Sequence, residues 1–412
     1  MSSRLLILSN GHGEDLIALR VLEALQRRRE NLEAAVLPLV GLGTVFAAAE
    51  REGRIRRIGP RGQLPSGGFS NQSLGGLLAD LRAGLPLLSL RQWQEVRAWG
   101  QGGDPVLAVG DLLPLLLAWS GGSPYGFIGT PKSDWTWASP PPRGWGASPL
   151  ADGYHRAKGS EWDPWEWALM GARRCRLVAV RDRLTASGLR RHGVAALAPG
   201  NPMMDGFGAP PPPAALERRR RLLLLPGSRM PEALGNLRRL LAALPDPLEP
   251  TTVLVATGAR PDATELDPLL ETGGFRPGPL SFDGAPTWER GRLQLLVGSG
   301  RFAAWASWAE LGLATAGTAT EQLVGLGMPA LSLPGPGPQF KAGFARRQSR
   351  LLGGAVQPCR NGEELRARMV QLLADGSERR RLGAIGRRRM GPAGGSDRLA
   401  ALIEERLLTP AF

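Results

Sequence analysis

Short apolar runs alternate with longer amphipathic stretches along most of this 412-residue chain. Consecutive Val, Leu and Ile predict strands buried on both faces, whereas an apolar spacing of three and four residues predicts helices. Strands are predicted at 4–9, 35–40, 105–109, 125–128, 176–180, 221–225, 252–256, 293–297, 311–315 and 329–333. Helices are predicted at 15–29, 163–173, 183–191, 231–244 and 319–326. This alternation indicates an α/β fold with parallel sheets covered on both faces.

The alternation breaks at 208–220, where "GAPPPPAALERRR" places four prolines before a basic run. Such a stretch is stiff and cannot join a sheet, so it predicts a linker. The opening pattern then starts again: "RLLILSNGHGEDLIALRVLEAL" at the N-terminus is matched by "RLLLLPGSRMPEALGNLRRLLAAL" after the break. We therefore predict two doubly wound α/β domains that face each other across a cleft. Their predicted extents are 1–207 and 221–390, with 391–412 as a C-terminal helix that packs back on the N-terminal domain.

The segment 130–167 fits neither pattern and is predicted to be an insert of the N-terminal domain. It holds six of the twelve tryptophans, together with many prolines and glycines. A long loop of this kind is either functional or packed on itself. We favour a loop packed on its own aromatic rings over an aromatic patch at a bilayer surface.

The net charge of the chain bears on which binding partners are expected. The net charge is +14, and only three of the 51 Lys and Arg residues are lysines. Arginine suits phosphate because its planar fork binds bidentately, so nucleotides, anionic lipid and nucleic acid are all compatible ligands. Arginines that only solvate helix surfaces would explain the same charge without a ligand. Scattered arginines without a recognised motif argue against nucleic acid.

Two features of the composition bear on location. Cys175 and Cys359 lie far apart, which predicts neither a disulfide nor a zinc site, and the N-terminus has no signal pattern, so a cytoplasmic protein is expected. The longest apolar run, 106–119, is shorter than the roughly 20 residues that span a bilayer. The stretch 74–93 is apolar with interspersed arginines and predicts either an interfacial helix on an anionic membrane or a core helix.

The clearest local signal is "LLLLPGSRMPEALGN". Gly227 and Ser228 follow a strand with exposed amides and a hydroxyl, Arg229 adds a cation, and a helix start follows, so the loop can hold a diphosphate. The alternative is a Pro-Gly turn with Ser228 as a helix cap.

A second loop of the same kind is "LGLATAGTATEQ". Small residues at a helix start allow a ligand to approach the backbone, and hydroxyls there suit phosphate oxygens. A side chain one turn into the helix can reach a ribose hydroxyl, whereas threonine capping explains the same residues without a ligand. The candidates are Gly317, Thr318, Ala319, Thr320, Glu321 and Gln322, with Gln339 on the later loop "GPGPQF" as a further candidate.

In the N-terminal half, Asp111 ends an apolar strand and is either a helix N-cap or a general base. His12 in "NGHGED" can accept a proton near neutral pH, and Gly11 and Gly13 allow close approach to the loop. The same loop ends in Glu14 and Asp15, whose charges suit a helix start. Gly11, Gly13, Glu14 and Asp15 are predicted to form the acceptor loop. The chain has no Asp-x-Asp pair, HExxH motif or Cys/His cluster, so neither a metal nor another cofactor is predicted.

Taken in order, "GD" at 110–111, "APGNPMMD" at 198–205, "PGSR" at 226–229 and "AGTAT" at 316–320 resemble lipid-A-disaccharide synthase and its relatives. These are glycosyltransferases of the two-Rossmann GT-B architecture. The resemblance covers most of the chain apart from the Trp-rich insert. It implies that Arg229, Thr318 and Thr320 belong to the nucleotide-diphosphate site of the donor, and that Asp111 is a catalytic carboxylate.

Two motifs depart from that family. Its opening loop, Gly-Glu-Ala-Ser-Gly-Asp, is here "NGHGED", in which Asp15 matches and Gly11 replaces the glutamate. Gln322 stands where the family has a ribose-binding glutamate. The "GHG" loop and the "PQF" segment are more similar to peptidoglycan and glycolipid glycosyltransferases of the same fold. We interpret the chain as a diverged branch whose sugar and acceptor differ from those of lipid A.

The predicted function is transfer of a sugar from a UDP-sugar to a lipid-linked or glycolipid acceptor, without a metal, at the cytoplasmic face of a membrane. His12 or Asp111 would deprotonate the acceptor, and Arg229 with helix dipoles would stabilise the departing nucleotide diphosphate. A nucleotide-sugar epimerase and a non-catalytic nucleotide-sugar-binding protein are the alternatives.

Overall fold

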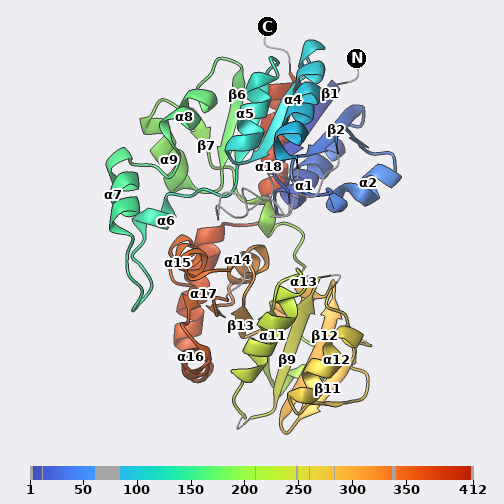
Figure 1. The fold of residues 1–412 in the computed structure, drawn as a ribbon, viewed down its shortest axis with the longest axis vertical. Coiled ribbons are helices and arrows are strands. Elements are labelled where there is room, and N and C mark those ends of the chain that lie inside the picture. Colours follow the sequence, from blue (N-terminus) through green and yellow to red (C-terminus); the bar gives the residue numbers. More distant parts are fainter. Residues whose placement is uncertain are drawn as a thin grey trace. The chain divides into compact units, whose positions relative to one another are not determined.

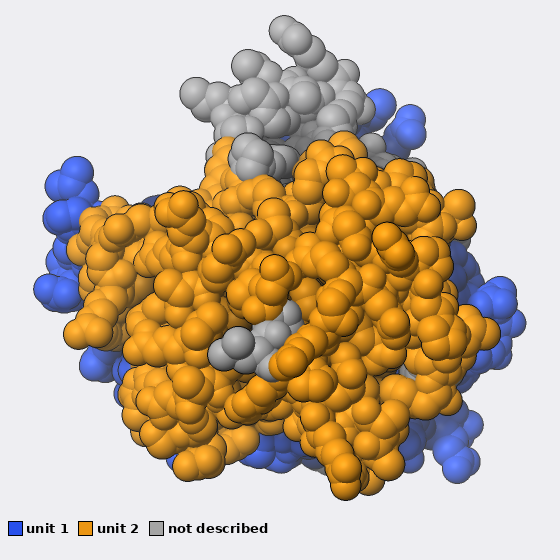
Figure 2. Space-filling model, turned by 90° about the horizontal axis from the view of Figure 1, so that it is seen from below, with its two compact units in different colours: residues 1–137, 149–205, 392–412 blue, residues 138–148, 206–391 orange. Residues whose placement is uncertain are grey.

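The computed structural model divides the chain into two compact units, coloured in Figure 2. Unit 1 comprises Met1–Trp137, Pro149–Asp205 and Pro392–Phe412, and unit 2 comprises Ala138–Ser148 and Gly206–Gly391. The structure describes residues 3–11, 13–60, 84–208, 210–246, 249–258, 260–282, 284–335 and 340–409. Among these, no helix is long and apolar enough to cross a bilayer.

Unit 1 is built on a parallel sheet with the strand order β3-β2-β1-β4-β5-β6-β7 (Figure 1). Its strands are β1 (Ser3–Ser9), β2 (Leu32–Pro38), β3 (Arg56–Arg57), β4 (Val106–Gly110), β5 (Tyr125–Gly129), β6 (Cys175–Val180) and β7 (Ala196–Leu197). Its helices are α1 (Gly13–Arg28), α2 (Ala47–Arg51), α4 (Leu85–Gln101), α5 (Leu112–Ser120), α6 (Trp135–Ala138), α7 (Pro149–Lys158), α8 (Pro164–Met170), α9 (Arg183–Arg191) and α18 (Gly395–Ile403).

Side chains alternate across this sheet and feed two separate cores. Leu5 and Ile7 of β1 pack with α1 and α18 on one face, whereas Leu6 and Leu8 pack with α4, α5 and α9 on the other. Because both faces are covered, the central part of each long strand is apolar, as the sequence pattern predicts.

Unit 2 contains the second sheet, in the order β10-β11-β12-β9-β8-β13-β14-β15. Pairing is parallel from β12 to β15, and β10 and β11 add an antiparallel edge. The strands are β8 (Arg220–Leu225), β9 (Thr251–Thr257), β10 (Arg276–Pro277), β11 (Thr287–Arg290), β12 (Leu293–Ser299), β13 (Leu311–Ala314), β14 (Ala330–Ser332) and β15 (Val356–Pro358). The helices are α10 (Ala214–Glu217), α11 (Glu232–Ala242), α12 (Ala263–Thr272), α13 (Phe302–Trp308), α14 (Thr318–Gly325), α15 (Ala342–Leu351), α16 (Gly362–Ala374) and α17 (Gly376–Met390). The predicted α/β class with two doubly wound sheets is confirmed.

The predicted boundaries need two corrections. The linker 208–220 is not wholly irregular, because α10 lies within it and β8 begins at its last residue. The insert 130–167 is not a structureless loop, since it contains α6, α7 and α8, and its part Ala138–Ser148 belongs to unit 2. Proline and glycine content suggested a loop, but prolines occupy the first turns of α7 and α8, where they favour a helix.

Arginines of unit 2 explain why Ala138–Ser148 belongs there. Nε of the buried Arg350 on α15 donates to the Ser139 carbonyl at 2.8 Å, and Arg346 donates to the Gly146 carbonyl at 3.0 Å. The Trp145 indole in turn donates to the carbonyl of Pro358 at 3.2 Å. The proline-rich segment cannot form a ladder, so side-chain donors satisfy its carbonyls instead.

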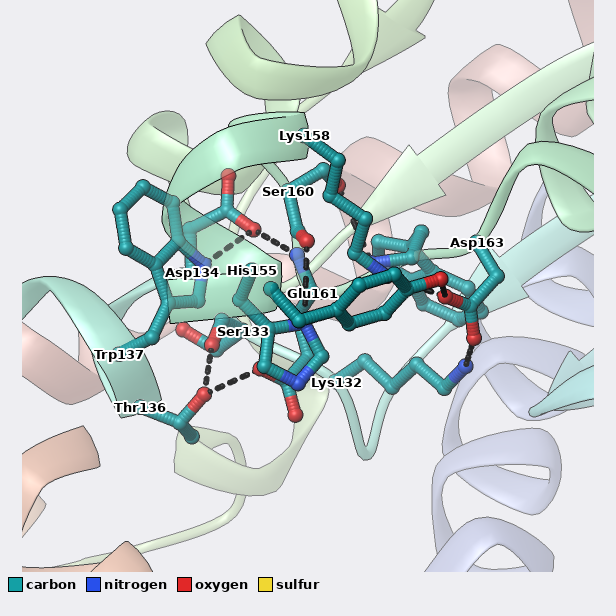
Figure 3. A network of polar contacts seen from close by, with 12 residues as sticks. Lys132, Ser133, Asp134, Thr136, Trp137, His155, Lys158, Ser160, Glu161 and Asp163 are labelled. Carbon is teal, nitrogen blue, oxygen red and sulfur yellow. Dashed lines mark hydrogen bonds and ion pairs between the residues drawn. The ribbon is translucent and has the colours of Figure 1, made fainter. Parts of the chain in front are cut away.

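A dense polar network holds the remaining insert together (Figure 3). Asp134 is fully buried and accepts a hydrogen bond from the Glu161 amide at 2.7 Å, and burial raises its pKa to about 6. Two of the three lysines pair here, Lys132 with Glu166 at 2.5 Å and Lys158 with Asp163.

The tryptophans of the insert pack differently from the prediction. Trp162 is buried edge-on against Phe127 of β5 at 5.5 Å, and Trp167 stacks on His192 at 3.6 Å between ring centroids. These two rings therefore pack on the sheet and on the end of α9 rather than on one another. The insert packs over one face of the sheet, since both faces of a parallel sheet are buried.

Asp205 anchors the C-terminal helix at the end of the "GNPMMD" segment. Its carboxylate accepts hydrogen bonds from the amides of Gly394 at 2.5 Å, Gly395 at 3.2 Å and Ser396 at 2.7 Å. These amides open α18, whose Leu399, Ala400 and Ile403 belong to the core on the α1 face of the sheet. A carboxylate at a helix start satisfies amides that lack an intrahelical partner and complements the helix dipole.

We predict that Asp205→Ala loosens α18. Loss of a carboxylate that caps three amides costs about 2 kcal/mol, which corresponds to roughly thirtyfold faster hydrogen exchange of the α18 amides. The matched control is Asp397→Ala in the same turn, because its ion pair with Arg27 at 2.9 Å is solvent-exposed and contributes well under about 1 kcal/mol. Equal exchange rates in the two variants would contradict the capping role.

Candidate functional site

The first candidate site lies where two neighbouring strands of unit 2 end. β8 and β13 are parallel partners, with Leu225 opposite Ala314, so the loops that follow them leave the same edge of the sheet. A cavity with about 660 Å³ of open space lies at this edge. It is lined by Pro226, Gly227, Ser228, Arg229, Glu232, Ala233, Gly235, Asn236, Arg239, Thr315, Gly335 and Phe340, and is called the unit 2 cavity below.

Local bonds shape the Pro226–Arg229 loop. Gly227 has a φ of 93°, a conformation that disfavours any residue with a Cβ atom. The Asn236 amide donates to the Pro226 carbonyl at 3.1 Å and ties the loop to α11, which starts shortly after it at Glu232. The start of α11 therefore opens beside the cavity and gives it positive potential.

Two cations and one carboxylate line the unit 2 cavity. Burial lowers the pKa of Arg229, and the nearby Glu232 acts in the opposite direction. Burial alone lowers the pKa of Arg239. Because a guanidinium stays protonated in proteins, the lining carries an excess of positive charge and suits an anion.

The second predicted loop is only partly at this cavity. Thr315, directly after β13, lines it, whereas residues 317–322 are not among the lining residues. Thr320 is buried, and its hydroxyl donates to the Ala316 carbonyl at 2.7 Å. Its hydroxyl thus bonds to the backbone one turn earlier, as threonine often does near a helix start.

The other candidates of this loop lie along the start of α14. Gly317 is its N-cap, and the loop is fixed by a hydrogen bond from the Gln348 amide to the Gly317 carbonyl at 3.1 Å. Thr318, Ala319 and Glu321 are half-buried in the first turn of α14, and Gln322 is buried. Gln339, like His12, lies outside the described residues.

In unit 1 the carboxylates of Glu14, Asp15 and Asp111 follow β1 and β4, which are parallel neighbours with Ser9 opposite Val109. Asp111 caps α5 by accepting from the Leu113 amide at 3.2 Å, and burial raises its pKa. Asp15 is buried and accepts from the Ser9 hydroxyl at 2.5 Å. Glu14 accepts from the Thr130 hydroxyl at 3.1 Å.

The proton affinity of Glu14 is strongly perturbed. Burial raises its pKa to about 7, with smaller contributions from the charges of Asp111 and Asp15. A carboxyl group that titrates near neutral pH beside other carboxylates is typical of a general base. From the sequence alone, Glu14 is predicted only as a member of the acceptor loop. The parallel order of β1 and β4, which puts it close to Asp111, is the signal that reveals it.

The glycines of this loop have different roles. Gly11 has a φ of 89°, and a Cβ atom there would lie 2.7 Å from the Val40 carbonyl oxygen, so close packing against the next loop requires glycine. Gly13 is the first residue of α1.

Unit 1 also contains a cavity, with about 330 Å³ of open space, which lies next to these carboxylates. Thr130, the partner of Glu14, is part of its lining together with Arg181 and Asn201. The remaining lining residues are Ile17, Ile128, Gly129, Ala179, Val180, Pro199, Gly200, Pro202, Met203 and Leu399. Among the described residues of both units, no three His, Cys, Asp or Glu side chains gather as a metal site would require.

No family model and no curated protein matches this sequence. Solved structures do match along nearly the whole length. MurG of Acinetobacter baumannii is 15% identical (TM-score 0.56, 98% of this chain and 99% of that one), and CalG4, the calicheamicin glycosyltransferase, is 16% identical (TM-score 0.59, 98% and 99%). UDP-GlcNAc 2-epimerase from Neisseria meningitidis bound to UDP-GlcNAc is 13% identical (TM-score 0.56, 98% and 100%).

The fold is GT-B. These identities establish the architecture alone, and it is shared by glycosyltransferases and epimerases. The closer likeness to lipid-A-disaccharide synthase stays a prediction from the sequence motifs.

We predict that Glu14→Gln stabilises the protein above pH 7. The pKa of Glu14 rises from 4.5 to about 7 on folding, so its favourable contribution is complete below pH 4.5 and disappears as the pH rises through 7. Removing the charge should therefore increase the free energy of unfolding by about 2–3 kcal/mol at pH 8 and change it little at pH 4.5. Thermal unfolding at the two pH values measures this difference.

The control for this prediction is Glu23→Gln on the same helix, whose carboxylate pairs with Arg54 at 3.7 Å near the surface. It should show no gain at pH 8. If Glu14→Gln were equally neutral at both pH values, the environment assigned to Glu14 would be wrong.

Proposed function

We propose that this chain is a glycosyltransferase that binds a UDP-sugar in unit 2 and transfers the sugar to a lipid-linked or glycolipid acceptor bound by unit 1. The observation that carries the donor part is the unit 2 cavity, where a glycine loop, a helix start and two half-buried arginines meet at the carboxyl edge of a parallel sheet. In open α/β sheets this edge is the usual ligand site. The Neisseria epimerase, which has the same fold, was solved with UDP-GlcNAc, and this supports a uridine nucleotide.

In the proposed reaction, Glu14 takes the proton of the acceptor hydroxyl, with Asp111 beside it. The hydroxyl oxygen then bonds to the anomeric carbon as the bond from that carbon to the diphosphate breaks. Arg229 and the start of α11 stabilise the charge that develops on the departing nucleoside diphosphate. His12, in the same loop as Glu14, is a further candidate base.

An epimerase is the second candidate function, favoured by the likeness to the Neisseria enzyme. An epimerase would change the sugar of its nucleotide donor with no acceptor present, whereas a transferase would leave the sugar unaltered until an acceptor is added. Chromatography of the nucleotide sugar after incubation without acceptor separates the two activities. A protein that only binds nucleotide sugars would keep the affinity and lack both activities.

The membrane part of the proposal is supported by one helical surface of unit 1, which we call the α4–α5–α8 face. Helix α5 contacts both α4 and α8. Five large apolar side chains on these helices are 39–55% exposed: Leu87, Leu90, Leu116, Trp119 and Trp165. Arg91 and Arg97 are exposed on α4, and Arg97 lies over the Trp93 ring at 5.2 Å. Exposed apolar side chains with interspersed arginines are typical of a surface that rests on anionic lipid.

Of the stretch predicted to be interfacial, 74–93, the part up to residue 83 lies outside the described residues. The remainder lies in α4, which is not a fully buried core helix. Its Val96 and Trp99 face the core, while Leu87 and Leu90 face solvent.

We predict that UDP stabilises the chain and that GDP, ADP and CMP do not. At 100 times its dissociation constant a ligand adds about 2.7 kcal/mol, which for a unit of this size raises the melting temperature by roughly 5–10 °C. Arg229→Ala should abolish the shift. Arg218→Ala, which removes an exposed arginine outside the unit 2 cavity, should retain it. The absence of a shift with UDP in the unaltered protein would overturn the proposed donor.

We predict further that the α4–α5–α8 face binds anionic vesicles. The double variant Leu87→Glu/Leu90→Glu should reduce co-sedimentation with phosphatidylglycerol vesicles about tenfold or more, and added salt should weaken binding of the unaltered protein. Leu280→Glu, at a 72% exposed leucine of unit 2, is the matched control and should bind normally. Unchanged binding by the double variant would exclude this face.

A further inference from the structure

Arg239 lies two turns into α11 and faces the unit 2 cavity. Glu232, Asn236 and Arg239 are spaced by four and three residues, so they follow one face of the helix, and all three line the cavity. The Nη2 atom of Arg239 donates to the Pro334 carbonyl at 2.5 Å. Pro334 follows β14, the parallel partner of β13. The guanidinium group therefore lies at the same edge of the sheet as the loops after β8 and β13.

The charge of Arg239 has little compensation. Within the described residues its only hydrogen bond is the one to Pro334, and its Nη1 atom is buried without a partner. Its pKa is lowered by burial, and no carboxylate opposes this effect, whereas Glu232 does so for Arg229. A buried donor without an acceptor is unfavourable, and more so when it belongs to a charged group. An uncharged side chain such as Leu or Gln would avoid this unfavourable burial of charge. A ligand that accepts hydrogen bonds from the guanidinium group therefore explains why an arginine is present.

We propose that Arg239 binds the diphosphate of the nucleotide donor together with Arg229. This inference rests on the proposed function of the unit 2 cavity and adds a contact that the sequence motifs do not contain. A nucleotide-sugar diphosphate carries one negative charge on each phosphate, and the two arginines supply one positive charge each. Arginine donates through a planar fork that matches phosphate oxygens, and in a partly desolvated cavity such bonds are strong.

The test compares uridine, UMP and UDP as ligands of the whole chain by isothermal titration calorimetry, with inorganic pyrophosphate as a competitor. Arg239→Ala and Arg239→Gln should weaken UDP binding about tenfold to hundredfold, weaken UMP less, and leave uridine unchanged. Pyrophosphate should compete with UDP in the unaltered protein and lose potency in both variants. Arg238→Ala is the matched control, since it removes the neighbouring, exposed charge of the same helix.

The outcomes separate this inference from the function on which it rests. If the unaltered chain binds UDP and both Arg239 variants bind it equally well, the contact is wrong and the donor site stands. An equal loss of uridine and UDP affinity would show that Arg239 only holds the loop after β14, which also overturns the contact. If the unaltered chain binds no uridine nucleotide, the proposed function fails and the inference fails with it.

Discussion

Parallel pairing of neighbouring strands is the constraint on which both candidate sites depend. Because β8 and β13 run in the same direction, the loops after them leave one edge of the unit 2 sheet, and β1 and β4 do the same in unit 1. Residues about 90 positions apart, such as Arg229 and Thr315, thereby line one cavity. The amides at the start of α11 and the half-buried Arg229 and Arg239 then determine that this cavity suits an anion.

Much of this architecture could be predicted from the sequence. Apolar runs located the long strands to within a few residues, because a strand buried on both faces must be apolar throughout. The short edge strands β3, β7, β10 and β15 were missed, since two or three residues show no periodicity. The insert was misjudged because its order comes from long-range bonds, such as Arg350 to Ser139 and the buried Asp134 to Glu161, which no local pattern reveals.

Some site residues could likewise be predicted from the sequence, and others could not. Gly227, Ser228 and Arg229 could be selected from their position after a strand, and they line the unit 2 cavity. Glu14 could be placed in the acceptor loop but not singled out as a base, and Arg239 could not be selected at all. What distinguishes them is a tertiary environment: burial beside Asp111 for Glu14, and an uncompensated charge beside Pro334 for Arg239. For Thr320 the fold adds a contact that the motif does not reveal, since its hydroxyl donates to the Ala316 carbonyl.

The central claim is that unit 2 holds a uridine diphosphate at the carboxyl edge of its sheet. A crystal structure of the full chain soaked with UDP tests it most directly. We predict that the diphosphate lies in the cavity lined by Gly227, Arg229, Thr315 and Arg239. Diphosphate density located in unit 1, or no density at a UDP concentration that saturates binding in solution, would contradict it.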